Sequence, residues 1–206
     1  METTKKENSI VFIEGGLRTI RPTKEEAILR DSESGFITYL ASVDKVDVLC
    51  PEPDRNTERR ELLKEFSEKE IQYYYFARIV PSWHEVIKTS DISFVDHLNN
   101  YKQELQKGVD DDWQDFDFTL ENMKSIHREI FHSEFNERDI DFIKKIINPT
   151  TKETAINKVA KASSTFRDVC IISKIEEYWN NGKSIFAVFG FAHAVIEEPA
   201  LRKLLN

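Results

Sequence analysis

The chain has 206 residues, enough for one domain with a sizeable core but short for two full ones. Its 40% hydrophobic and 32% charged residues exclude disorder over most of its length. The formal charge of −8 argues against a non-specific nucleic-acid binder. No run of about 18 apolar residues predicts a membrane span, and the N-terminus has no apolar leader. We therefore expect a cytoplasmic protein that contacts neither nucleic acid nor a membrane.

Three short apolar runs predict β-strands. Residues 10–14 are β-branched and aromatic, and a pair of glycines follows them. Residues 45–50 form a second run, which stops at a Pro-Glu-Pro turn, and residues 184–189 form a third, which ends at Gly190. The first two strands are separated by a helical segment, as a parallel βαβ unit requires.

Helical periodicity fills most of the remaining chain. Thr23 with Glu26, and Ser67 with Glu70, form the Ser/Thr-x-x-Glu pattern of an N-terminal capping box. We expect a helix from Thr23 and further helices over residues 35–42, 57–66, 67–79, 91–105, 120–131, 137–147 and 152–179, the last with a break near Ser163-Ser164, and one more after His193. The predicted fold is thus α/β: a small, mainly parallel sheet flanked by helices, in a single domain over residues 1–206, with a large helical insertion at about 57–165.

An acidic stretch over residues 108–117 interrupts the helical insertion. It lacks the glycine and the terminal glutamate of an EF-hand calcium loop. We interpret it as a solvated linker. Cys50 and Cys170 lie in apolar surroundings without CxxC spacing, so we expect two reduced core thiols.

Each predicted strand is followed by a side chain that can act in acid–base catalysis or bind a metal: Glu14, Glu52 and His193. The carboxyl ends of parallel strands lie on one edge of a sheet, where open α/β folds bind ligands. Two carboxylates and an imidazole there could activate a water or hold a divalent metal. The alternatives are a structural histidine at a helix start and a solvated turn glutamate at position 52.

Three arginines are candidates for binding an anion or stabilising an oxyanion. We place Arg18 and Arg78 near strand ends and Arg167 at the start of a helix. Arg167 and Asp168 could also form no more than an intrahelical or capping pair.

Two stretches near the C-terminus resemble the closing signature of the erythromycin esterase, ChaN, TIKI and TraB-like superfamily. They are residues 167–177, an arginine-containing helix, and residues 182–193, a strand that ends in a GxxH motif. Residues 11–18 are similar to that superfamily's glutamate-ending strand, and residues 35–41 and 51–53 to the helix and strand that follow it.

The resemblance implies a hydrolase that attacks an ester or peptide carbonyl with an activated water, in a small-molecule or peptide substrate. Glu14 and His193 would act as base or metal ligands, and Arg167 would stabilise the anion. It also implies an earlier strand with its own GxxH or GExH motif. Only nine residues precede Ile10, and they hold neither Gly nor His. The chain is then expected to be a truncated or inactive member, and the alternative is a non-catalytic binding or regulatory module.

Overall fold

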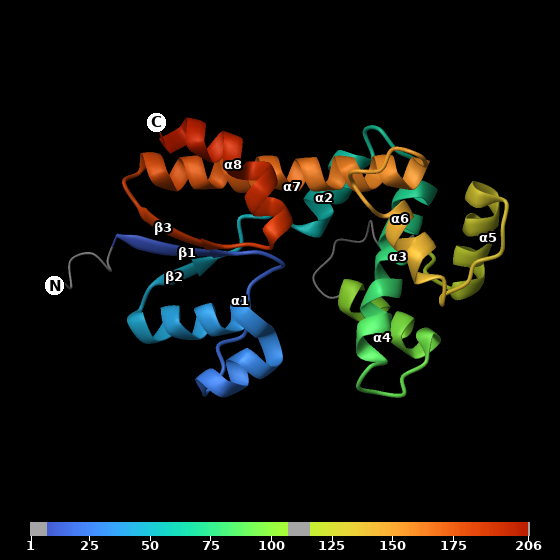
Figure 1. The fold of residues 1–206 in the computed structure, drawn as a ribbon, viewed down its shortest axis with the longest axis horizontal. Coiled ribbons are helices and arrows are strands. Elements are labelled where there is room, and N and C mark those ends of the chain that lie inside the picture. The colour runs from blue at the N-terminus through green and yellow to red at the C-terminus, as the bar shows by residue number, and fades with distance from the viewer. Residues whose placement is uncertain (1–7, 107–115, 206) are drawn as a thin grey trace. The chain divides into compact units, whose positions relative to one another are not determined.

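The computed structural model describes residues 8–106 and 116–205, and the chain forms two compact units (Figure 1). The first unit combines the stretch up to Pro53 with the stretch from Arg167 onward, and the second spans residues 54–166. The second unit is the inserted helical stretch expected at about 57–165. The expected fold class, a small parallel sheet flanked by helices with a helical insertion, is confirmed.

The sheet of the first unit has three strands in the order β2-β1-β3, with β1 (Ser9–Ile13) in the centre. β2 (Asp47–Leu49) and β3 (Ser184–Val188) both pair with β1 in parallel. The β-branched and aromatic residues of β1 suit a strand that is buried on both faces. All three strands therefore end at the same edge of the sheet.

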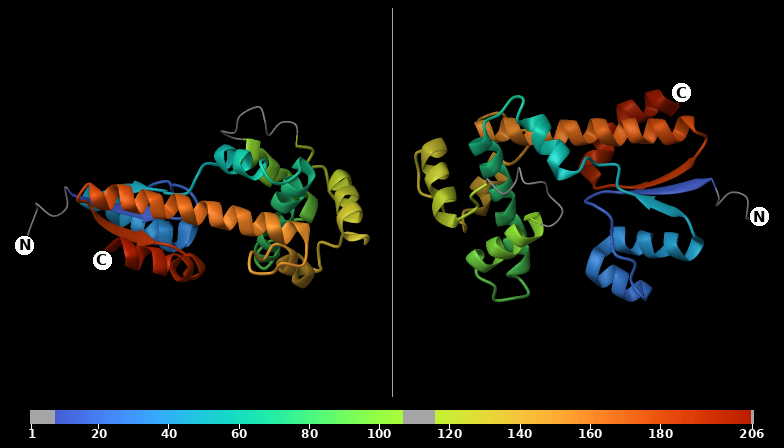
Figure 2. Two further views of the ribbon diagram at one scale, coloured as in Figure 1. Left: turned by 90° about the horizontal axis from the view of Figure 1, so that it is seen from above. Right: turned by 180° about the vertical axis from the view of Figure 1, so that it is seen from behind.

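Helices cover both faces of this sheet, as Figures 1 and 2 show. Side chains alternate along a strand, so Val11 and Ile13 pack with α1 (Lys24–Asp44) through Ala41. Ile10 and Phe12 pack on the opposite face, against the second half of α7 (Ala155–Asn180) and α8 (Phe191–Leu205). The aromatic partner on that face is Tyr178, whose ring meets Phe12 edge-on at 5.4 Å.

Helix α1 is kinked, and this explains why the sequence pattern predicted two helices there. Thr23 is its N-cap, as expected, and its hydroxyl accepts a hydrogen bond from the Glu26 N–H at 3.2 Å. Ser32 has φ 53 and ψ −142, which breaks the helical path. A Cβ on Gly35 would lie 2.6 Å from the carbonyl oxygen of Ala27, so only glycine permits this close turn.

The second unit is helical among its described residues. Its helices are α2 (Arg55–Leu62), α3 (Glu68–Val86), α4 (Phe94–Gln106), α5 (Leu120–Phe131), α6 (Ile140–Ile146) and the first half of α7. The capping box predicted at Ser67 and Glu70 is confirmed at the start of α3. Tyr73 and Phe76 of α3 are fully buried at the centre of this unit's core.

Two predicted helix boundaries were wrong. α7 runs through Ser163 without a break, because the Ser163 hydroxyl lies buried and hydrogen-bonded to Glu58 and Tyr74 rather than ending the helix. α8 begins at Phe191, so His193 lies inside its first turn rather than before it. Most of the acidic stretch interpreted as a linker, residues 108–115, lies outside the described residues.

None of the helices in the described ranges is long and apolar enough to cross a membrane.

Candidate functional site

The sheet has its topological switch point between β1 and β3. The chain leaves β1 toward α1 on one face, and it leaves the neighbouring strand β3 toward α8 on the other face. Open α/β sheets bind ligands at the carboxyl edge where such connections diverge. Glu14 follows β1 at this point, and Gly190 follows β3 opposite it.

Glu14 joins the two strand ends. Its Oε2 accepts a hydrogen bond from the Gly190 N–H at 2.7 Å. A Cβ on Gly190 would lie 3.0 Å from Glu14 Oε1, so the glycine lets the carboxylate approach the backbone. Arg18 braces the turn after β1 by donating to the carbonyl of Gly15 at 2.8 Å and that of Glu14 at 3.5 Å.

Glu52 and Arg167 form an ion pair beside these strand ends. The other carboxylate oxygen of Glu52 accepts the Gly15 N–H at 3.0 Å, which ties the turn after β2 to the turn after β1. The Cys50 thiol lies 3.9 Å from the same oxygen. Burial raises the pKa of this thiol, which keeps it neutral and argues against a thiolate nucleophile.

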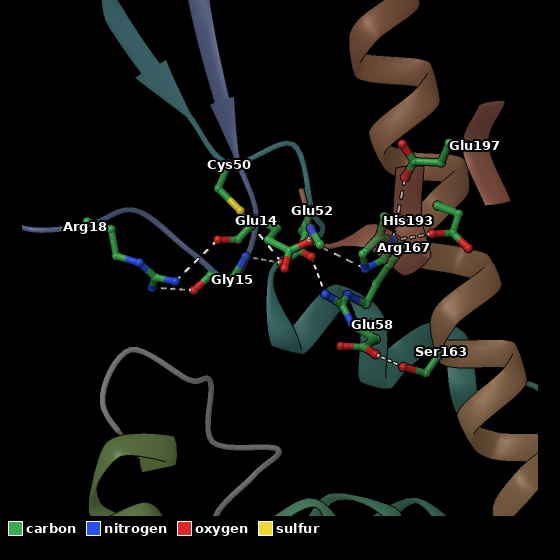
Figure 3. Close-up of polar contacts among 12 residues, drawn as sticks. Glu14, Gly15, Arg18, Cys50, Glu52, Glu58, Ser163, Arg167, His193 and Glu197 are labelled. Atoms are coloured by element: carbon green, nitrogen blue, oxygen red, sulfur yellow. Dashed lines mark hydrogen bonds and ion pairs between the residues drawn. The ribbon is translucent and has the colours of Figure 1, made fainter. Parts of the chain in front are cut away.

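Three carboxylates lie within 4 Å of the His193 ring nitrogens, and Figure 3 labels two of them, Glu14 and Glu197. Its Nδ1 is hydrogen-bonded to Asp168 Oδ1 at 2.7 Å and lies 3.7 Å from Glu197 Oε1. Its Nε2 lies 3.9 Å from Glu14 Oε2, too far for a direct hydrogen bond. The ring is thus oriented through Nδ1, while Nε2 faces the edge of the sheet that carries Glu14.

Glu197 is a buried carboxyl. Its side chain is 1% exposed, and within the described part of the chain neither carboxylate oxygen has a hydrogen-bond donor. Burial, and then the charge of Asp168, raise the pKa of Glu197 to about 7; Glu14 and Glu52 add to this, while His193 opposes it. The Glu197 carboxyl therefore keeps its proton to a higher pH than an ordinary glutamate does.

The structure brings four of the predicted site residues together: Glu14, Glu52, Arg167 and His193. Arg18 lies beside them but donates to backbone carbonyls. Arg78 does not follow a strand, contrary to the prediction. It lies within helix α3 of the other unit, 5.5 Å over the ring of Tyr74, because the run that precedes it is helical.

Asp168 and Glu197 were not among the predicted site residues. Asp168 was considered only as a partner of Arg167, yet its carboxylate is hydrogen-bonded to His193. Glu197 is four residues after His193, which places both on one face of α8. That spacing would have indicated the pair if the helix had been extended back to Phe191.

The group of described residues that could hold a metal ion differs from the predicted set of Glu14, Glu52 and His193. It consists of Asp168, His193 and Glu197, whose ligand atoms all lie within 4.8 Å of one another. Glu14 and Glu52 are instead engaged by the N–H groups of Gly190 and Gly15 and by Arg167.

Glu197→Gln is expected to change how stability depends on pH. The folded state raises the pKa of Glu197 from 4.5 to about 7, so it keeps a proton that the unfolded chain loses between these values. The resulting stability is fully present below pH 4.5 and is lost as the pH rises through 7. The glutamine variant stays neutral, so its free energy of unfolding at pH 8 should exceed that of the wild type by roughly 2–3 kcal/mol.

Urea unfolding at pH 5 and pH 8, with a chelator present, measures this difference. Glu198→Gln is the matched control, because Glu198 is the exposed neighbour that pairs with Arg202. It should keep the wild-type dependence on pH. The same loss of stability in wild type and Glu197→Gln would contradict the raised pKa.

Comparison with known proteins gives no match: no protein-family model, curated protein or solved structure matches the chain. Membership of the erythromycin esterase, ChaN, TIKI and TraB-like superfamily therefore stays a prediction. The functional argument depends on the geometry around His193.

Proposed function

We propose that the chain is a hydrolase in which His193 activates a water for attack on an ester or peptide carbonyl. The observation that carries the proposal is the environment of one ring: Asp168 binds Nδ1, while Nε2 faces Glu14 at 3.9 Å. A carboxylate that fixes the tautomer and orientation of a histidine is the arrangement general bases require.

In the proposed reaction Nε2 carries the proton, while Nδ1 stays hydrogen-bonded to Asp168. Nε2 takes a proton from water while the water oxygen bonds to the carbonyl carbon, and Asp168 stabilises the imidazolium that forms. Arg167 stabilises the oxyanion of the tetrahedral intermediate. The intermediate then breaks its bond to the leaving oxygen or nitrogen, and that atom takes the proton from Nε2 as it departs. The products are a carboxylic acid and an alcohol or amine.

A further feature supports this proposal. Glu14, Arg167 and His193, the positions that resemble the superfamily's motif, lie in one polar network at the edge where open α/β sheets bind ligands. Under this proposal the chain shares with the superfamily it resembles both the order of the motifs and the hydrolysis of a carbonyl substrate.

A panel of activated esters and short peptides tests the proposal. Wild-type protein should hydrolyse at least one of them, and His193→Ala should be inactive on that substrate. If the wild type turns over no member of the panel faster than His193→Ala does, the hydrolase proposal fails. The site is then better explained as that of a non-catalytic binding module.

Gly190→Ala is expected to lower hydrolysis by about tenfold with little loss of stability. The new Cβ would meet Glu14 Oε1 at 3.0 Å and displace the carboxylate by a few tenths of an ångström. The contact is with the end of a flexible side chain, so folding tolerates it, whereas catalysis is sensitive to small misplacements. Initial rates and the melting temperature measure the two effects. An unchanged rate would show that the position of Glu14 does not matter for the reaction.

A further inference from the structure

We infer that Asp168, His193 and Glu197 form a binding site for a divalent first-row cation such as Mn²⁺, Co²⁺ or Zn²⁺. This inference rests on the proposed function for the reaction, carbonyl hydrolysis at the same site, and replaces only the step in which His193 is the base: a cation there would activate the water instead. Asp168 comes from α7, and His193 and Glu197 come from consecutive turns of α8. The three ligand atoms lie within 4.8 Å of one another.

The separations suit ligands that share one ion. Two ligands about 2.1 Å from a cation are at most about 4.2 Å apart. His193 Nδ1 is 2.7 Å from Asp168 Oδ1 and 3.7 Å from Glu197 Oε1. Small rotations of the side chains would therefore be enough to bring all three onto one ion.

Glu197 is the observation that separates this group from an ordinary acidic cluster. Its side chain is 1% exposed and points at His193, yet neither of its oxygens accepts a hydrogen bond from the described residues (Figure 3). Buried polar atoms are nearly always paired with protein, water or an ion. Arg167, a cationic side chain of the same site, forms an ion pair with Glu52.

The donor set indicates the class of cation. One imidazole nitrogen and two carboxylates suit Mn²⁺, Co²⁺ and Zn²⁺, whereas Ca²⁺ takes six to eight oxygen ligands. Three protein ligands leave coordination positions open for water, as in catalytic metal sites rather than structural ones. A cation with a water in such a position lowers the pKa of that water.

Glu14 has a defined place in this site. When Nδ1 binds a cation, the neutral ring carries its proton on Nε2, which faces Glu14 Oε2 at 3.9 Å. A carboxylate that accepts a hydrogen bond from a ligating histidine fixes the ring and raises its basicity. Glu14 would take this role once its Oε2 and His193 Nε2 close from 3.9 Å to hydrogen-bond distance. Glu14 is itself held by the Gly190 N–H. The cation-bound ring no longer acts as the base, so cation binding and the Asp168–His193 hydrogen bond exclude each other.

Cobalt titration of the chelator-treated full chain tests the inference. We expect one equivalent of Co²⁺ per chain, with the visible absorption of a cation held by nitrogen and oxygen ligands. Glu197→Gln should weaken binding by at least tenfold. Glu198→Gln, the exposed neighbour, should bind as the wild type does. Asp168→Asn is a second ligand variant with the same expected loss.

The outcomes separate this inference from the proposed function. If the wild type binds no Co²⁺, or if Glu197→Gln and Asp168→Asn bind it as tightly as the wild type, the cation site is overturned. Hydrolysis by His193 and Asp168 alone would then still stand. If Co²⁺ binds as expected and no carbonyl substrate is hydrolysed with it, the cation site is supported and the hydrolase proposal is not.

Discussion

His193→Ala is expected to lower the rate of hydrolysis about 1000-fold. The loss follows from removing the group that takes the proton from water, since a positioned acid–base residue contributes roughly 10²–10⁴-fold. It also follows if the ring holds a cation, because the variant removes the only nitrogen ligand of Asp168, His193 and Glu197. The effect should fall on kcat more than on KM, because His193 acts on the water rather than on the bulk of the substrate.

The control for this variant is His97→Ala. His97 lies on α4 of the other unit, where its ring contacts Ser82. Removing it should leave the rate within about twofold of wild type. Asp168→Asn should fall between the two, since it disturbs the orientation of the ring without removing it. A His193→Ala protein that keeps its fold by circular dichroism and loses no activity would contradict the role of this residue.

Phe12→Ala is expected to destabilise the sheet unit by about 3–5 kcal/mol, the cost of deleting a fully buried aromatic side chain. Phe12 lies at the centre of β1, is 0% exposed and packs edge-on against Tyr178 of α7. The same strand carries Glu14 at its end, so activity should fall with the fraction of folded protein. Hydrogen exchange of β1, followed by mass spectrometry, measures the local loss of stability.

Phe186→Ala is the matched control. Phe186 lies on the neighbouring strand β3 and is 56% exposed. Exposed side chains contribute little to folding, so its removal should cost less than about 1 kcal/mol. Equal destabilisation by the two variants would show that β1 is not the buried centre of the sheet.

The strands could be predicted from the sequence because each is a short apolar run closed by Gly or Pro. The carboxyl-edge positions of Glu14, Glu52 and His193 followed from parallel pairing, which the strand–helix–strand order indicated. The strand order β2-β1-β3 could not be predicted, because it depends on which face each connecting helix covers. The switch point between β1 and β3 was therefore visible only in the structure.

Glu197 and Asp168 were missed for two different reasons. Starting the last helix after His193, rather than at Phe191, hid the fact that Glu197 shares its face. Asp168 was hidden for a different reason, because its partner is 25 residues away in sequence and no local pattern reports such a contact. Arg78 was placed near a strand end although the sequence predicted a helix over residues 67–79, and the structure confirms that helix as α3.

Isotope incorporation from water tests the central claim, that this edge of the sheet activates a water for carbonyl hydrolysis. The wild type would be incubated in ¹⁸O-water with a substrate from the ester and peptide panel, and the acid product analysed by mass spectrometry. We expect one ¹⁸O atom per molecule of newly formed acid at early times, and no product above background with His193→Ala. Acid product without ¹⁸O, or equal incorporation by the wild type and His193→Ala, would contradict the claim.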